Sequence, residues 1–93
     1  MDAISTAKLR ELLSQSEMLI AQVHTLYNQY FSGVLKMPPL KLRDRLDRMI
    51  KALEPMEKPT VTLKFQHQSL EARYVTFREL WEKRMKDYEL GRQ

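Results

Sequence analysis

The sequence predicts an all-α fold of three helices, in which the long first and third helices form an antiparallel hairpin and a short second helix packs against it. Only 2 glycines and 4 prolines occur in 93 residues, which leaves little of the turn chemistry that β-hairpins need. Apolar residues recur at helical spacing in three stretches. Gly33, Pro38 and Pro55 separate these stretches, and we expect one domain over residues 1–93.

The first helix is expected from about residue 5 to residue 31. Leu9 and Val23 belong to a seven-residue series, and a second series begins three residues later at Leu12, which is the pattern of one apolar stripe and is typical of a coiled coil. The opposite face is polar but nearly uncharged, as in a contact surface or plain solvent surface. Gly33 follows the helix, since glycine adopts the left-handed conformation of a helix end at little steric cost.

The second helix is expected from about residue 39 to residue 53, because Pro38-Pro39 suits a helix start. Arg43 with Asp47, and Asp47 with Lys51, stand four residues apart, a spacing that stabilises a helix by roughly 0.2–0.5 kcal/mol per ion pair. Its predicted apolar residues are Leu42, Leu46, Met49, Ile50 and Leu53.

The third helix is expected from about residue 61 to residue 90, with two stripes on nearly opposite faces. The stronger stripe predicts the core and consists of Leu63, His67, Leu70, Tyr74, Phe77, Trp81, Met85 and Tyr88. The weaker stripe consists of Phe65, Ser69, Ala72, Thr76 and Leu80. Two packing faces require neighbours on both sides, yet the second helix spans only about 22 Å against about 40 and 45 Å for the long pair.

These features predict a non-enzymatic module for protein–protein interaction or oligomerisation, acting as a homodimer or by binding a partner helix. The candidate contacts are Phe65, Ser69, Ala72, Arg73, Thr76 and Leu80. The alternative is a small basic nucleic-acid-binding protein, because the net charge is +4 and the isoelectric point is near 9.5. Its candidate residues are Lys36, Lys41, Arg45, Arg48 and Lys58, and such binding is expected to weaken steeply with salt.

Catalytic, cofactor and metal sites are not expected, nor is a small-molecule substrate. Of the residues three and four positions from His67, only Glu71 is a possible metal ligand, and His24 has no supporting motif. The absence of cysteine excludes thiolate metal sites and suits a reducing compartment. No run approaches the roughly 20 apolar residues that cross a bilayer, and the start does not resemble a signal peptide. We therefore expect a cytoplasmic protein without a membrane span.

Two short elements carry a resemblance to a known family. They are Tyr-Phe-x-Gly at residues 30–33 and Gln-Ser-Leu-x-x-Arg-Tyr at residues 68–74, followed by Phe77 and Trp81. The order of residues from Leu26 to Gln93 resembles a small uncharacterised all-helical domain at the C-terminus of larger bacterial proteins, myxobacterial ones among them. The resemblance implies a recurring module and no particular chemistry.

Overall fold

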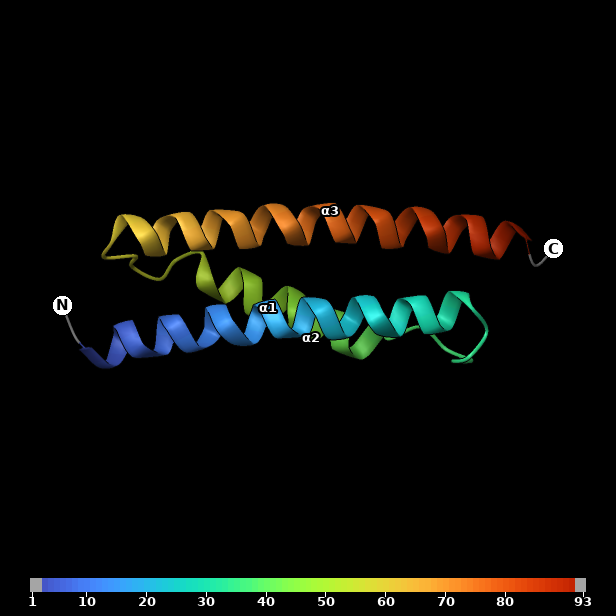
Figure 1. Ribbon diagram of the computed structural model, residues 1–93, viewed down its shortest axis with the longest axis horizontal. Coiled ribbons are helices and arrows are strands. Elements are labelled where there is room, and N and C mark those ends of the chain that lie inside the picture. The colour runs from blue at the N-terminus through green and yellow to red at the C-terminus, as the bar shows by residue number, and fades with distance from the viewer. Residues whose placement is uncertain (1–2, 92–93) are drawn as a thin grey trace.

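The computed structural model of the chain describes residues 3–91. It contains the helices α1 (Ala3–Phe31), α2 (Leu40–Leu53) and α3 (Val61–Gly91), as Figure 1 shows. No strand occurs in residues 3–91. The predicted all-α class, with two long helices and a short second helix, is confirmed.

The two long helices run in the same direction, so the predicted antiparallel arrangement of the first and third helices is wrong. In Figure 1 both run from left to right, and α2 runs back in the opposite direction. The side-chain contacts have the same order, since Trp81 Nε1 donates to His24 Nδ1 at 3.1 Å and the Tyr88 ring lies 4.8 Å from that of Tyr30. Each short connection reverses the chain once, and two reversals return α3 to the direction of α1.

The core lies along the line where α1, α2 and α3 meet. Trp81 is fully buried, and its ring stacks on Tyr27 with the centroids 5.0 Å apart. The stronger stripe of α3 supplies the core as predicted, with Phe77 and Met85 packed against it in part. The buried apolar residues include Leu9, Leu13, Ile20, Val23, Tyr27, Leu46, Leu53, Leu63, Leu70, Tyr74 and Trp81.

Arg43 joins α2 to both long helices. Its guanidinium donates to the Tyr27 hydroxyl at 3.2 Å and to Glu82 Oε1 at 2.6 Å. Burial lowers the pKa of Arg43, but the hydrogen bonds to Tyr27 and Glu82 raise it by more, so its pKa lies above the ordinary value. Of the two expected pairs with Asp47, only the one with Lys51 forms, at 2.8 Å.

Hydrogen bonds define the two connections. Gly33 has a φ of 88° at the end of α1, and the N–H groups of Val34 and Leu35 both donate to the Gln29 carbonyl. The Thr60 hydroxyl accepts from the Leu63 N–H at 3.1 Å, which caps α3. The chain therefore turns at the places that its glycine and proline residues indicate.

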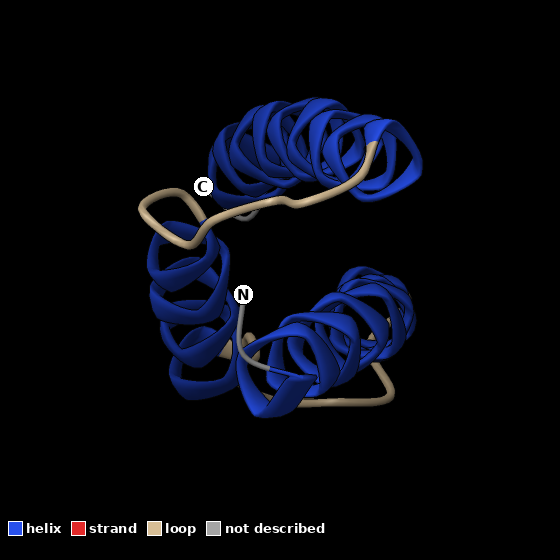
Figure 2. Ribbon diagram, turned by 90° about the vertical axis from the view of Figure 1, so that its left-hand side faces the viewer, coloured by secondary structure: helices blue, strands red, loops and turns tan. Residues whose placement is uncertain are grey.

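The molecule is a rod of 55 × 18 × 16 Å. Figure 2 shows α2 on one side of the α1–α3 pair, with no helix on the side of α3 that faces away from α1 and α2. The described chain thus supplies neighbours for only one face of α3.

Candidate protein-interaction surface

The outward side of α3 carries the weaker stripe of the sequence. We call it the outer face of α3, and it consists of Val61, Phe65, Ser69, Ala72, Thr76 and Leu80, all of them exposed. Phe65 is 68% exposed and Val61 83%. Since no described element covers these side chains, the second packing face of α3 is left to solvent.

The outer face of α3 is uncharged over most of its length. Ser69 is its polar residue in the first half, and the exposed side chains of Gln68, Arg73 and Glu79 stand at its border. The Thr76 hydroxyl donates to the Ala72 carbonyl at 2.9 Å. Because that bond lies within the helix, the Thr76 hydroxyl keeps its acceptor when another chain covers the residue, and its burial leaves no unsatisfied donor.

The outer face of α3 has a symmetric order of side-chain sizes. Phe65 and Leu80 lie at equal distances from a midpoint between residues 72 and 73, and Ser69 and Thr76 lie at equal distances from the same midpoint. Phe65 and Leu80, the large residues of this symmetric part, stand about 22 Å apart at 1.5 Å per residue, and the small residues stand between them. Val61 lies outside the symmetric part, because the position symmetric to it is Arg84. In a pair of chains related by a two-fold axis, a face with this order places large residues opposite large ones and small residues opposite small ones.

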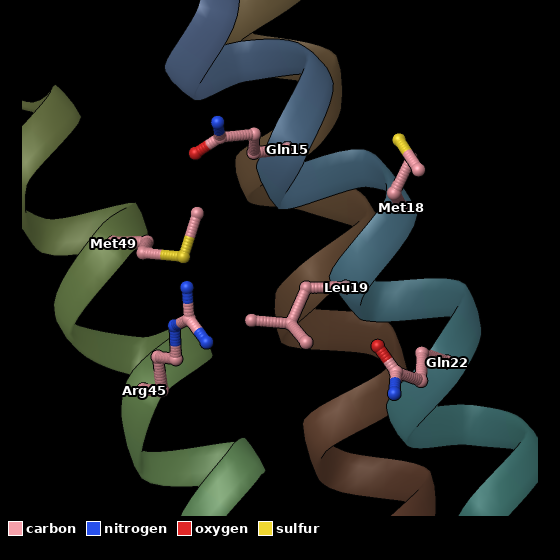
Figure 3. Close-up of a pocket in the computed structure, with 6 residues that line it drawn as sticks. All are labelled: Gln15, Met18, Leu19, Gln22, Arg45 and Met49. Carbon is pink, nitrogen blue, oxygen red and sulfur yellow. The ribbon is translucent and has the colours of Figure 1, made fainter.

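The structure brings together three of the five basic residues that the alternative function requires. Lys41, Arg45 and Arg48 are exposed on one side of α2, at helical spacings of four and three. Figure 3 shows Arg45 extending over a shallow pocket between α1 and α2. The pocket is lined by Gln15, Met18, Leu19, Gln22, Arg45 and Met49.

The other two basic residues lie apart from this side of α2. Lys58 donates to the carbonyls of Leu53 and Glu54, so its ammonium group binds the C-terminal end of α2 and does not point to the exposed side of that helix. Lys36 is exposed in the connection between α1 and α2. The basic cluster that the sequence suggested is therefore reduced to three residues on α2.

The histidines are part of the packing between helices. His24 accepts the Trp81 hydrogen bond and lies 4.7 Å from the Phe77 ring. Burial, followed by the charge of Arg84, lowers the pKa of His24. Burial also lowers the pKa of His67, whose Nδ1 lies 3.3 Å from Glu71 Oε1.

No group of three or more histidine, aspartate or glutamate side chains within the described part of the chain is arranged to hold a metal ion. Likewise, none of the described helices has the length and hydropathy to cross a membrane.

One surface was not predicted from the sequence. Val34, Met37 and Leu40 are 71%, 76% and 50% exposed, and we call them the apolar corner. Val34 and Met37 lie in the connection, and Leu40 is the first residue of α2. Helical periodicity cannot predict which side chains are exposed in such a segment. The available signal was composition, because four large apolar residues (Val34, Leu35, Met37 and Leu40) stand within seven positions that contain no acidic residue.

Comparison with known proteins found no matching protein-family model, curated protein or solved structure. The resemblance to a bacterial C-terminal helical domain therefore stays a prediction.

Proposed function

We propose that this protein is a non-enzymatic, self-associating module that pairs with a second copy through the outer face of α3. The observation that carries the proposal is the symmetric order of exposed residues on that face, large at the ends and small in the middle. In an antiparallel pair, Phe65 would lie against Leu80 of the second copy and Ser69 against Thr76 of the second copy. The small residues at the centre would let the two helix backbones approach closely.

The charge distribution allows a second copy to occupy this face, although the two chains carry the same net charge. Each chain carries a net charge of +4, so two chains repel one another at most relative orientations. The outer face of α3 lacks charge from Val61 to Ala72, which makes it a surface where two copies meet with little repulsion. The charged exceptions are Arg73 and Glu79. The symmetric register places the two Arg73 side chains on opposite sides of the axis, each beside Ala72 of the second copy, and the exposed Glu79 stands beside Leu80.

The exposed apolar area sets the expected strength of the pair. Covering two copies of Phe65 and Leu80 removes roughly 400 Å² from water, worth about 10 kcal/mol at 25 cal/mol per Å². Association costs about 4–15 kcal/mol in lost freedom of motion. We therefore expect a weak dimer that dissociates on dilution, in the lower range of protein interfaces.

Sedimentation equilibrium over a wide range of protein concentration tests the proposal. The wild-type mass is expected to rise from monomer toward dimer, and Phe65→Asp is expected to remain a monomer because it places two carboxylates in the contact. Met18→Asp is the matched control, since Met18 is 70% exposed on α1, and it should dimerise as the wild type does. A monomer at every concentration, or equal loss in both variants, would contradict the proposal.

A second candidate function is nucleic-acid binding through Lys41, Arg45 and Arg48. The observation that favours it is that these exposed side chains share one side of α2, with no carboxylate bound to them among the described residues. Three phosphate contacts predict a slope of about −3 for log affinity against log salt. Fluorescence anisotropy with a labelled duplex at low salt measures it, and the same affinity for the double variant Lys41→Glu, Arg45→Glu would exclude it.

The lack of cysteine suits a reducing compartment, and we place the module in the cytoplasm.

A further inference from the structure

The connection between α1 and α2 exposes apolar side chains although its backbone is held in place. Ser32 N–H donates to the Asn28 carbonyl at 3.0 Å, and Val34 N–H donates to the Gln29 carbonyl at 2.8 Å. At the other end, Leu40 N–H donates to the Pro38 carbonyl at 2.9 Å. The exposure of the apolar corner is therefore a property of an ordered connection with bonds at both ends.

The backbone of this connection presents few free hydrogen-bond donors. Pro38 and Pro39 have no N–H group, and the N–H groups of Val34, Leu35 and Leu40 are already bonded within the chain, which leaves those of Lys36 and Met37 without a bond in the connection. An environment poor in water penalises every unsatisfied N–H group. The apolar corner can therefore enter such an environment at a lower desolvation cost than an ordinary loop.

Basic residues border the apolar corner directly, and the nearest carboxylate along the chain is that of Asp44, which stands one helical turn after Leu40 and lines a pocket with it. Lys36 precedes Met37 directly, and Lys41 follows Leu40 directly. Between Glu17 and Asp44 the chain contains no acidic residue. A protein partner that covered three apolar side chains would not require lysines beside them. A lipid bilayer with anionic headgroups does match this pattern, because its apolar layer lies directly below a negatively charged surface.

We propose that the apolar corner inserts into the interface of an anionic lipid bilayer, with Lys36 and Lys41 at the level of the headgroup phosphates. Short apolar insertions are stabilised by burial at the boundary of the acyl chains, and basic residues near the surface add to this through the negative surface potential. Figure 1 shows the connection at one end of the elongated molecule. The outer face of α3 contains no residue of the apolar corner, so this binding does not depend on dimerisation.

Cosedimentation tests the proposal with phosphatidylcholine vesicles prepared with and without phosphatidylglycerol. The wild type is expected to bind the anionic vesicles and to bind the neutral ones at least about tenfold more weakly. The double variant Met37→Ser, Lys36→Glu is expected to lose at least about tenfold in affinity for anionic vesicles. Its matched control is Met18→Ser, Lys8→Glu on α1, which removes an exposed methionine and reverses a lysine away from the corner and should bind as the wild type does.

Single changes separate insertion from simple charge attraction. Met37→Trp is expected to shift tryptophan emission to shorter wavelength when anionic vesicles are added, and Met18→Trp is not, with buried Trp81 as a constant background. No binding to anionic vesicles, or equal binding to neutral ones, would overturn the proposal. The proposal would also be overturned if Lys36→Glu lost vesicle binding, Met37→Ser did not, and the wild type bound duplex DNA as tightly as anionic vesicles. Those results would favour a general site for polyanions.

Discussion

Replacing Arg43 by methionine tests whether this side chain holds α2 against both long helices. The change keeps most of the side-chain length but removes the hydrogen bonds to Tyr27 and Glu82. Tyr27 is fully buried, so its hydroxyl loses a charged donor worth about 1.5 kcal/mol. The Glu82 side chain is 51% exposed, and screening by solvent reduces that ion pair to about 0.5–1 kcal/mol. We expect Arg43→Met to lower the free energy of unfolding by about 2 kcal/mol.

Urea unfolding followed by circular dichroism measures this change, at a protein concentration low enough to keep the chain monomeric. The matched control is Lys41→Met, because Lys41 is exposed on the same helix and its removal should change stability by less than about 0.5 kcal/mol. Glu82→Gln should lose only the smaller part, about 0.5–1 kcal/mol. Arg43 does not hold α2 in this way if Arg43→Met is as stable as Lys41→Met. The same conclusion follows if Arg43→Met is more stable than the wild type, as happens in some proteins when apolar residues replace a buried ion pair.

Three further outcomes are expected. Burial lowers the pKa of both His24 and His67, so the unfolded chain binds protons more readily than the folded one. The free energy of unfolding should therefore be highest above about pH 6.5 and fall as the pH drops through the lowered pKa values. Urea unfolding of His24→Gln, measured from neutral to mildly acidic pH, should show a smaller loss, and an equal slope would contradict this origin. Leu46→Ala should cost about 2–5 kcal/mol, since Leu46 is fully buried, and a cost below about 1 kcal/mol would remove Leu46 from the core. Burial and the hydrogen bond to Asp47 raise the pKa of Tyr74 to about 12, so in an alkaline absorbance titration Tyr74→Phe should lack the tyrosine transition at about pH 12 that the wild type shows.

The helices and the core of α3 could be predicted from the sequence, because the periods of apolar residues and the positions of Gly33 and Pro38 are local properties. The relative direction of the two long helices was missed, although it follows from counting chain reversals. The role of Arg43 could not be predicted in this way. A carboxylate four residues along the same helix, Asp47, was an equally good partner by spacing, and only the packing of α2 brings Glu82 within reach.

The outer face of α3 was predicted as a contact surface from the spacing of Phe65, Ser69, Ala72, Thr76 and Leu80, and the structure leaves these residues exposed. Whether they bind a second copy is not a local property, since it depends on a surface that a single chain does not contain. The apolar corner was missed for a different reason. Apolar residues in a connection are often covered by the rest of the fold, and sequence alone does not indicate that Met37 remains 76% exposed.

Proximity of the two Ala72 residues is the most direct test of the proposed pairing of two copies through the outer face of α3. The chain contains no cysteine, so a substituted cysteine is the single thiol of each chain. Under mild oxidation Ala72→Cys should form disulfide-linked dimers much faster than Ala52→Cys, which places an exposed thiol on α2, because a disulfide requires Cα atoms about 4.4–6.8 Å apart. Equal rates of disulfide formation in the two variants would contradict the proposed pairing.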